Sequence, residues 1–406
     1  MKPTKSKITS LKQLLVHIPS YLVTRLAKKH GVDKQCRTIS PWSHVVSLIF
    51  TQLSHALSLN DVCDNLKNHS SILKSLRGAV APSRNGLSNA NRTRNHKMAE
   101  ELFWEVQSHI QSKYPTFGHG KKYVGLPRRF KRMINVVDST TIKLVANCMD
   151  WAKHRRRKAA AKCHMRLDLQ TFLPRFALVK NAKSHDAVEA IELCADIKSG
   201  EIVLFDKAYI DFNHLKNLDD REVFWVTRAK DNMSYKVMGQ HSAPKGNIIS
   251  DKIVKLKIDK SKKQYPKEMR IVTASVEVNG ENVEMTFMTN NMDWASSSIC
   301  DLYKARWSIE VFFKQLKQTL QLADFLGHNE NATQWQIWTA LLTYLLLRYV
   351  AFLSKWKGSF ARLFTILRGV IWNCYDIMDM LKSYGTAKEK IPRMRVAVEQ
   401  LYIPGL

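Results

Sequence analysis

The chain has no pair of cysteines separated by two residues, and its seven cysteines are scattered along 406 residues. They stand at positions 36, 63, 148, 163, 194, 300 and 374. Structural zinc sites use closely spaced cysteines, and secreted disulfide frameworks use even numbers of them. The pattern therefore argues against both and predicts reduced thiols in a cytoplasmic protein.

Acidic residues are also scarce in this sequence. Asp and Glu number 35 against 64 Lys and Arg, which gives a net charge of +29. So large an excess of one sign costs free energy through self-repulsion unless a polyanion binds to it. We therefore expect nucleic acid as the partner, with a membrane surface or an RNA-rich assembly as the alternatives.

Signal peptides and long membrane-spanning runs are missing as well. The N-terminal segment is basic but has no long apolar core and no cleavage site. Residues 335–353 are apolar enough to raise a membrane span, but Thr339, Thr343 and Arg348 interrupt them. We predict a buried helix there and no membrane partner.

The hydrophobic patterning predicts an α/β protein with more than one domain. Apolar residues recur every three or four positions in residues 1–125, which indicates a helical N-terminal region. Short strand-like runs with one helical segment fill 130–229, and period-two alternation with an Asn279-Gly280 turn predicts a β-rich insertion at 230–298. Residues 299–350 return to a helical pattern, and 351–406 form a helical C-terminal region, a candidate for dimerisation.

Two aspartates each close a short apolar run that reads as a core strand. Asp138 ends the run at 134–138, and Asp206 ends the run at 201–206. Carboxylates at the ends of neighbouring strands can converge within a few ångströms. Asp211 and Asp186 compete with Asp206 for this role, but neither ends an apolar strand.

A third acid lies on a segment that the spacing predicts to be one continuous helix over residues 303–320. Glu310 shares a narrow stripe of that helix with Tyr303, Arg306, Lys314 and Lys317, beside an apolar face. A carboxylate among cations and a phenol suits a group that holds a metal next to a phosphate. The alternative is an ordinary surface acid that pairs with Arg306 and Lys314. Three carboxylates would suit Mg²⁺, with Mn²⁺ as a substitute, better than a metal that prefers His or Cys.

The spacing Tyr303-x2-Arg306-x3-Glu310-x6-Lys317 resembles the signature of the insertion-sequence-4 family of DDE transposases. The segments NVVDST around Asp138 and IVLFDKAYIDF around Asp206 are similar to the same family. FWVTRAKDN and the RWSIE context of Glu310 also fit it. The resemblance covers roughly residues 130–340, and its four-residue signature is the most specific part.

The resemblance implies a ribonuclease-H-like catalytic core in two parts, 130–229 and 299–350, interrupted by the β-rich insertion. It implies that Asp138, Asp206 and Glu310 are the catalytic, metal-binding residues, and that Tyr303, Arg306 and Lys317 contact DNA phosphates. The expected activity is Mg²⁺-dependent cleavage and strand transfer at terminal inverted repeats, by cut-and-paste through a hairpin intermediate. It further implies a homodimer on double-stranded DNA, at the nucleoid in the bacterial cytoplasm, with residues 1–125 as a DNA-binding domain.

Two alternatives to a transposase remain open at this point. One is a catalytically inactive, transposase-derived regulator that only binds DNA. The other is a ribonuclease-H-like nuclease that cleaves without strand transfer. Three intact acids at the predicted site argue against the regulator, because acids on a phosphate-facing surface oppose the binding of a polyanion.

Further DNA contacts are expected outside the four-residue signature. Lys314 lies on the same stripe, and Trp307 either stacks on DNA or packs against its own helix. A basic run contains Arg155, Arg156 and Arg157, which we interpret as a phosphate-contacting loop rather than a solvated one. Residues 82–97, rich in Asn, Ser and Arg, predict either a short DNA-facing helix or a solvated loop. His164 and His185 receive no functional role.

The basic run generates a test of its own. Replacing Arg155, Arg156 and Arg157 together by alanine is expected to flatten the plot of log K for DNA against log salt. If each arginine neutralises one phosphate, the slope falls by about 2.7, because each neutralised phosphate contributes about 0.9. Titrations of DNA binding at several salt concentrations measure the slope. A slope equal to that of the unmodified chain would show that the basic run does not contact DNA phosphates.

Overall fold

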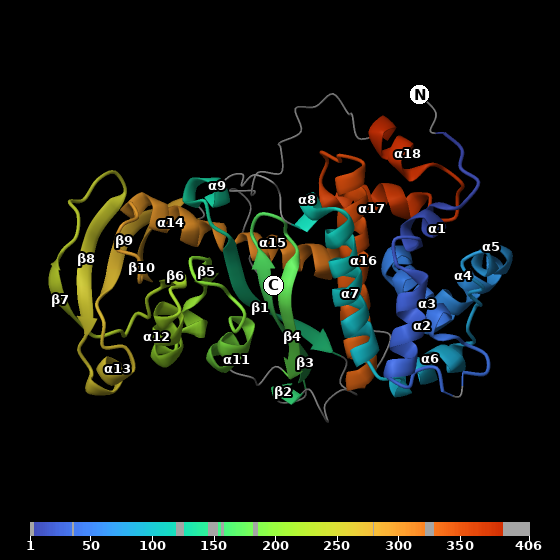
Figure 1. Cartoon of the computed structure of the whole chain (residues 1–406), viewed down its shortest axis with the longest axis horizontal. Coiled ribbons are helices and arrows are strands. Elements are labelled where there is room, and N and C mark those ends of the chain that lie inside the picture. Colours follow the sequence, from blue (N-terminus) through green and yellow to red (C-terminus); the bar gives the residue numbers. More distant parts are fainter. Residues whose placement is uncertain are drawn as a thin grey trace. The chain divides into compact units, whose positions relative to one another are not determined.

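The computed structural model describes residues 4–34, 36–118, 126–144, 153–155, 158–181, 186–278, 280–320 and 329–384. The chain divides into two compact units (Figure 1). Unit 1 takes residues 1–120, 142–161 and 313–395, and unit 2 takes residues 121–141, 162–312 and 396–406. The N-terminal and C-terminal helices, which the sequence separates into two regions, thus belong to one unit. The domain boundaries expected from the sequence stay predictions.

Unit 1 is built from helices around one long, apolar helix. That helix, α16 (Glu330–Leu353), packs against α3, α6 and α7 and is buried along most of its length. By length and composition it is the one described helix that passes as a membrane span, yet 78% of its apolar window is buried inside the protein. The prediction of a buried helix at 335–353 is therefore confirmed. The helices of unit 1 are α1 (Ser10–Leu15), α2 (Ser20–Lys29), α3 (Pro41–Ser54), α4 (Leu59–Asn68), α5 (Ser70–Lys74), α6 (Arg84–Thr93), α7 (Lys97–Lys113), α8 (Pro115–Gly118), α16, α17 (Phe360–Gly369) and α18 (Ile377–Tyr384).

Buried polar groups on α16 are satisfied within the helix itself. The Thr339 hydroxyl donates to the Trp335 carbonyl at 2.7 Å, and the Thr343 hydroxyl donates to the Thr339 carbonyl at 2.8 Å. A threonine that bonds the preceding turn does not need water, so it can lie in an apolar core. The two threonines that seemed to interrupt the apolar run are thus compatible with burial.

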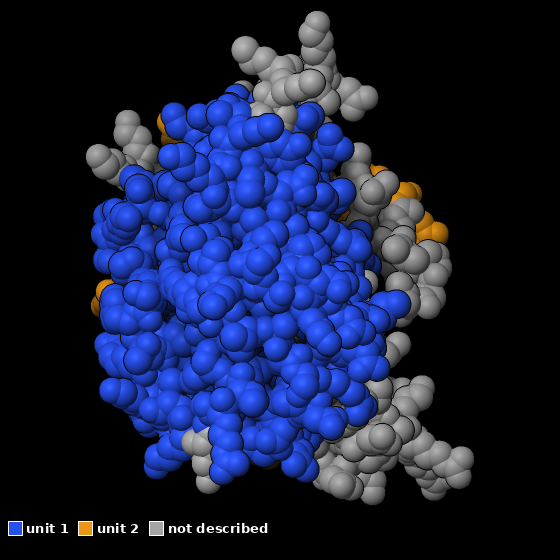
Figure 2. All heavy atoms as spheres, turned by 90° about the vertical axis from the view of Figure 1, so that its right-hand side faces the viewer, with its two compact units in different colours: residues 1–120, 142–161, 313–395 blue, residues 121–141, 162–312, 396–406 orange. Residues whose placement is uncertain are grey.

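The two ends of the described chain are joined within unit 1. Ser10 N–H donates to the Asn373 carbonyl at 2.9 Å, and the Gln13 side chain donates to the Tyr375 carbonyl at 2.6 Å. Thr4 bonds the Asp379 carboxylate through both its N–H and its hydroxyl. Figure 2 shows one face of unit 1, drawn in blue, as a continuous surface. The first and last helices of the described chain are therefore parts of one core.

A ten-stranded sheet carries the rest of the fold, in the order β2-β3-β1-β5-β6-β10-β9-β8-β7 with β4 beside β3. Its three central strands β1, β5 and β6 are parallel, and the strands from β6 to β7 are antiparallel. Every residue of β5 is buried, as expected for a strand covered on both faces. The strands are β1 (Ile134–Leu144), β2 (Lys153–Arg155), β3 (Lys158–Asp168), β4 (Pro174–Asn181), β5 (Ile202–Phe205), β6 (Phe224–Arg228), β7 (Tyr235–Gln240), β8 (Ile248–Leu256), β9 (Met269–Val278) and β10 (Glu281–Thr289).

Helices of unit 2 pack on the central strands and close a second core. Trp225 of β6 is fully buried there with Leu215 and Leu218 of α12. Those helices are α9 (Leu126–Phe130), α11 (Asp186–Leu193), the short 3₁₀ helix η2 (Lys207–Tyr209), α12 (Phe212–Asp220), α13 (Asp259–Gln264), α14 (Ser296–Ala305) and α15 (Ser308–Lys314). The whole is a mixed α/β fold, as the sequence predicts.

The strand expected to end at Asp138 is longer than predicted. β1 continues through Asp138 to Leu144, and only its pairing with β5 stops, at Val137 opposite Phe205. The residues that follow the apolar run, up to Leu144, are therefore the second half of β1. A continuous apolar run marks the part of a strand that is buried on both faces. Past Val137, the buried residues Thr140 and Ile142 alternate with more exposed ones.

The continuous helix expected over 303–320 is also wrong. α14 ends at Ala305, α15 starts at Ser308, and a π-helical stretch follows at Gln315–Thr319. At the break, Arg306 N–H donates to the Tyr303 carbonyl and Glu310 N–H donates to the Trp307 carbonyl. Bonds over three residues and over five residues turn the chain by different angles from an α-helix, so a single helical stripe does not persist.

The β-rich insertion has the predicted hairpin. β9 and β10 pair in antiparallel fashion from Val278 and Glu281 outwards, and Gly280 between them has φ +82°. Glycine populates that region without the steric cost that a side chain brings. Asn279, the other turn residue, lies outside the described residues.

A buried ion pair fastens this insertion to the start of α14. Arg270 of β9 donates to both oxygens of Asp251 of β8, at 2.8 and 2.6 Å, and both side chains are almost fully buried. The hydroxyls of Ser242 and Ser296 each donate to Asp251 at 2.6 Å, and Ser296 is the first residue of α14. Burial would raise the pKa of Asp251, but these donors outweigh it and hold the pKa at about 2. The pair therefore fixes where α14 begins.

Replacing Asp251 by asparagine is expected to lower the free energy of unfolding of unit 2 by about 3–5 kcal/mol, because Arg270 would be left charged in an apolar environment. Chemical denaturation at pH 7 measures the loss. Since the pKa of Asp251 is depressed in the folded chain, the loss should be largest above pH 4 and shrink as the pH falls towards 2.

A matched control pairs Lys255 of β8 with Glu268, the residue just before β9. Glu268 pairs with Lys255 at 3.3 Å, with both side chains about two-fifths exposed. An exposed pair contributes at most about 1 kcal/mol. A Glu268→Gln loss as large as that of Asp251→Asn would show that burial is not what makes the Asp251–Arg270 pair strong.

Candidate active site

Asp138 and Asp206 follow the last paired residues of two adjacent parallel strands. Val137 of β1 lies opposite Phe205 of β5, so the two aspartates come next on neighbouring strands. Asp206 then caps η2, where its Oδ1 accepts the Ala208 N–H at 3.1 Å. The sheet register therefore brings together two carboxylates that lie 68 positions apart in the sequence.

The Arg306 guanidinium joins two of the three predicted acids. Its Nη1 donates to Asp138 Oδ2 at 2.6 Å, and its Nη2 donates to Glu310 Oε1 at 3.1 Å. The Arg306 side chain is only 7% exposed, whereas that of Glu310 is 43% exposed. The break between α14 and α15 lets Arg306 turn inwards while Glu310 stays at the surface.

Tyr303 joins the third acid to the same group. Its hydroxyl donates to Asp206 Oδ2 at 3.4 Å, and its buried ring packs against Phe287 of β10 at 4.9 Å between centroids. The Arg306 guanidinium lies 5.5 Å from the centre of the Tyr303 ring, within reach of a cation–π contact. Asp138, Asp206, Tyr303, Arg306 and Glu310 thus form one connected cluster, which we call the carboxylate cluster.

The electrostatics of the cluster are set mainly by burial. Burial raises the pKa of the Asp138 carboxyl to about 6, although Arg306 and the Ser139 N–H favour its charged form. The nearby charges of Glu310 and Asp206 add to the rise. Burial lowers the pKa of Arg306, but Asp138 and the other neighbours outweigh it and raise that pKa. The guanidinium therefore stays charged and offsets part of the repulsion among the acids.

The cluster has the oxygen donors that a hard divalent cation prefers. Two aspartates and one glutamate surround one positive group, with no His or Cys among them. Among the residues that the structure describes, no group of three or more His, Cys, Asp and Glu side chains is arranged to hold a metal ion. The guanidinium occupies the place between Asp138 and Glu310, so the metal-binding assignment of the three acids stays a prediction.

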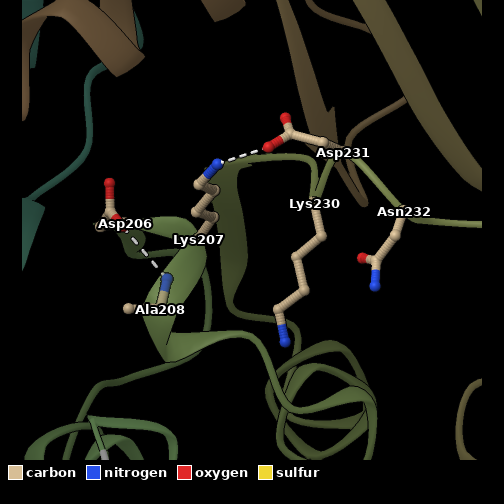
Figure 3. Close-up of a pocket in the computed structure, with 6 residues that line it drawn as sticks. All are labelled: Asp206, Lys207, Ala208, Lys230, Asp231 and Asn232. Atoms are coloured by element: carbon tan, nitrogen blue, oxygen red, sulfur yellow. Dashed lines mark hydrogen bonds and ion pairs between the residues drawn. The ribbon is translucent and has the colours of Figure 1, made fainter.

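A groove of about 530 Å³, lined by two lysines and two aspartates among other residues, lies beside Asp206 (Figure 3). It is lined by Asp206, Lys207, Ala208, Lys230, Asp231 and Asn232. Lys207 reaches Asp231 at 2.8 Å, and Lys230 donates to the Ile210 carbonyl at 3.2 Å. The sequence analysis missed this groove. The sequence contains an indication of it, because Lys207 and Lys230 each come two positions after the end of β5 or β6, and parallel strands end at the same edge of a sheet.

A partly buried polar network next to Asp138 was missed as well. Asp186, the first residue of α11, pairs with Lys162 at 2.7 Å and accepts from the Ser139 hydroxyl at 3.1 Å. His164 is fully buried, with Nδ1 at 3.3 Å from the Tyr209 hydroxyl, and burial lowers its pKa to about 4. Asp186 is therefore bonded within this network, to Lys162 and Ser139.

Asp211, the other competitor of Asp206, also has a structural role. It caps α12, where its carboxylate accepts the His214 N–H at 2.9 Å. Neither competitor is bonded to Tyr303 or Arg306, whereas Asp206 is bonded to Tyr303. The geometry therefore supports Asp206 as the second acid of the cluster.

Several predicted DNA contacts fall outside the cluster. Lys314 is exposed at the end of α15 and Lys317 lies in the π-helical stretch, both within unit 1. Trp307 is half-buried in the break between α14 and α15. Arg155 ends β2, and Arg156, Arg157 and His185 lie outside the described residues. The DNA-binding roles of these residues, and of Tyr303 and Arg306, stay predictions.

Comparison with family models gives two matches. Residues 129–346 match the transposase DDE domain, and residues 6–76 match a domain of unknown function, DUF4372. All five residues of the carboxylate cluster lie in the first range. That range covers more than half of the chain.

Several curated proteins are similar over the same part of the chain. A putative transposase of Sinorhizobium fredii is 33% identical over 233 residues, which are 56% of this chain and 64% of the relative. A probable transposase for insertion sequence element IS5377 of Geobacillus stearothermophilus is 27% identical, over 55% of this chain and 58% of the relative. The transposase InsG for insertion sequence element IS4 of Escherichia coli is 26% identical, over 54% and 49%. The matched part of this chain spans about half to just under two thirds of the length of these relatives.

One solved structure aligns along the full chain. It is a piggyBac transposase synaptic complex with hairpin DNA, with a TM-score of 0.47 and 10% identity over 100% of this chain and 89% of the other. That TM-score is below the level that establishes a shared fold.

The raised pKa of Asp138 predicts a gain of stability on its removal. The folded chain holds a proton on Asp138 more tightly than the unfolded chain, whose aspartate has a pKa near 3.8. The charged carboxylate therefore costs free energy above pH 6 and nothing below pH 4. Asp138→Asn should raise the free energy of unfolding by as much as ~3 kcal/mol at pH 7.5, at 1.36 kcal/mol per pKa unit.

Denaturation of both proteins in EDTA across pH 4–8 measures that gain. It should fade between pH 6 and pH 4. Asp301→Asn on α14, which removes a half-exposed carboxylate paired with Arg129, is the control and should give no such profile. A gain that is the same at pH 4 and pH 7.5 would show that burial of the Asp138 charge is not its origin.

Proposed function

The chain belongs to the transposase DDE domain family, and from this premise we propose that it is a DNA transposase of an insertion sequence. It binds the terminal inverted repeats of its element, cleaves DNA strands there and transfers them to target DNA by cut-and-paste. The reaction is a metal-dependent phosphoryl transfer. Double-stranded DNA is the partner, and the strongly basic charge of +29 supports a polyanion.

The observation that carries this proposal is the carboxylate cluster itself. Asp138 and Arg306 lie 168 positions apart, yet they are bonded, and Arg306 is bonded in turn to Glu310. In the proposal Asp138, Asp206 and Glu310 hold Mg²⁺, for which Mn²⁺ substitutes, and the bound ions supply charge stabilisation for the phosphoryl transfer. Water, and later the freed 3′ hydroxyl, attacks the phosphodiester.

The chain holds its two aspartates in closely similar ways. One oxygen of each accepts a backbone N–H, from Ser139 at 2.7 Å for Asp138 and from Ala208 at 3.1 Å for Asp206. The other oxygen of each is bonded to Arg306 or Tyr303. Backbone donors fix the carboxylates before any ligand arrives, which is the pre-organisation that a catalytic site needs.

Arg306 and Tyr303 then have two roles in the proposal. In the free chain they satisfy the carboxylates, and in the complex they bind phosphates of the transposon end. The second role requires each side chain to exchange a carboxylate for a phosphate oxygen. An arginine fork is suited to both partners, because its donors match carboxylate and phosphate geometry equally well.

The groove beside Asp206 supplies a path for the DNA strand. Lys207 and Lys230 carry positive charge, and the Asn232 amide adds a donor at the same wall. We assign to this groove the backbone phosphates next to the scissile bond. Lys314, Lys317 and Trp307 contribute further DNA contacts in the proposal, as does the basic run at Arg155, Arg156 and Arg157.

The remaining assignments concern the fold and the assembly. We propose that the central strands with α14 and α15 form a ribonuclease-H-like core and that β7–β10 are its insertion. The helical N-terminal region binds DNA, and two copies act together on paired ends in the bacterial cytoplasm. These assignments rest on the family and on the strand order.

The test is an assay of DNA cleavage and joining by the full chain with Mg²⁺. The substrates are duplexes that carry the terminal repeats of the element encoding the chain. Asp138→Asn, Asp206→Asn and Glu310→Gln should each reduce cleavage to background while DNA binding persists. Asp211→Asn is the control, because asparagine also caps a helix and α12 is outside the proposed chemistry.

Each other outcome has its own meaning. Cleavage by Asp206→Asn would show that the second acid is misassigned. Cleavage without the joining of a pre-cleaved end to target DNA would identify a nuclease. Binding without cleavage by the unmodified chain would identify a regulator and overturn the proposed function.

A further inference from the structure

The chain has several long stretches without an acidic residue, and one of them includes α6. Residues 65–99 contain neither Asp nor Glu, although 35 of the 406 residues are acidic. The flanking acids, Asp64 and Glu100, lie on α4 and α7. The stretch contains α6 and falls between the two family matches, at 6–76 and 129–346, for most of its length. It is therefore a cationic segment to which no function is assigned.

The middle of this stretch forms a helix. This is one of the two alternatives that the sequence analysis gave for residues 82–97, the other being a loop. The Ser83 hydroxyl caps α6 by accepting the Gly86 N–H at 3.1 Å. Leu87, Ala90 and Asn91 are buried and face the core of unit 1. A good N-cap and a buried stripe explain why a segment rich in Asn and Ser is helical.

The C-terminal end of α6 is held by side chains of α16, which α6 contacts within unit 1 (Figure 1). Asn331 donates to the Asn91 carbonyl at 2.9 Å, and Trp335 donates to the Arg94 carbonyl at 2.7 Å. The Asn91 side chain is bonded in turn to buried His44 at 2.8 Å. The carbonyls that a helix leaves unpaired at its end are thus satisfied from the core, and α6 is a rigid element.

The opposite side of α6 is polar and exposed. Its outward residues come at helical spacing and are Arg84, Asn85, Ser88, Asn89 and Arg92. Among the residues that the structure describes, the Arg84 side chain has no hydrogen-bond or ion-pair partner, and the Arg92 side chain bonds only to Asn89, at 3.1 Å. These side chains are available to a ligand.

Two other arginines of the stretch are used differently. Arg77 donates to the Ile18 carbonyl at 2.8 Å and lies over the Trp42 ring at 4.8 Å. Arg94 donates to Cys36 and to the carbonyls of Ile39 and Ser40. The side chains of these two arginines are therefore engaged in contacts within the fold. The arginines on the outer face of α6 remain available to a ligand.

We propose that α6 is the helix that reads base sequence in the major groove of duplex DNA, an inference that rests on the proposed function. Arginine and asparagine are the side chains whose paired groups match guanine and adenine edges there. A ten-residue helix is about 15 Å long, which suits one passage of the groove. The outward residues include no apolar side chain, unlike the centre of a protein interface, and the major groove of double-stranded RNA is too narrow for a helix.

The experiment measures affinity of the full chain for two duplexes of equal length and composition. One carries the terminal repeat of the element, and the other has the same bases in shuffled order. Arg84→Ala, Asn85→Ala and Arg92→Ala should each reduce the ratio of the two affinities roughly 5- to 150-fold, as expected for loss of one base contact. Single base substitutions in the repeat should lose their effect at one position for each variant.

Arg362→Ala is the matched control. It removes one exposed arginine from α17, another helix of the same unit, and it should leave the affinity ratio unchanged. A thermal melt of each variant checks that the fold persists, which we expect because the replaced side chains are exposed.

The outcomes separate this inference from the proposed function. If the variants cleave and bind with the ratio of the unmodified chain, α6 does not read bases and the transposase proposal stands. If affinity for both duplexes falls equally, α6 contacts only phosphates, and the base-reading role is overturned. If the unmodified chain neither prefers nor cleaves its repeat, both proposals fail together.

Discussion

The Arg306 guanidinium is the interaction on which the carboxylate cluster depends. It is nearly buried, and it joins Asp138 from the middle of β1 to Glu310 from the first turn of α15. Removing Arg306 would leave the carboxylates of Asp138 and Glu310 without the cation that they share. The sheet register brings Asp138 and Asp206 together, and Arg306 adds Glu310 from another part of the sequence.

The position of that cation is set from a distance by the β-rich insertion. Asp251 and Arg270 are buried between β8 and β9, and Ser296 at the start of α14 is bonded to Asp251. α14 then carries Tyr303 and ends beside Arg306. The insertion thus supports the cluster, since it fixes the helix that carries Tyr303 and leads directly into Arg306.

Much of the fold is visible in the sequence, and the failures have specific causes. The hairpin at Gly280, the buried helix at 335–353 and the strand before Asp206 follow from local pattern, and the structure confirms them. The family resemblance, read from the Tyr303–Lys317 signature, is confirmed by the matched domain. Local pattern did not reveal that β1 continues past Asp138, because strand ends depend on pairing with other strands. It also missed the break at Arg306, because the partner that draws Arg306 inwards is 168 positions away. The structure joins no two of the six cysteines that it describes by a disulfide, and Cys148 lies outside the described residues, so the expectation of reduced thiols stays a prediction.

The register between β1 and β5 has a consequence for how this chain can vary in length. Side chains alternate between the two faces of a sheet, so one residue inserted or deleted between Ile134 and Val137 would turn Asp138 to the opposite face. The same holds between Ile202 and Phe205 for Asp206. Insertions and deletions tolerated in related chains are therefore expected in the turns, and the spacing inside these two short strands should be invariant even where their residues differ.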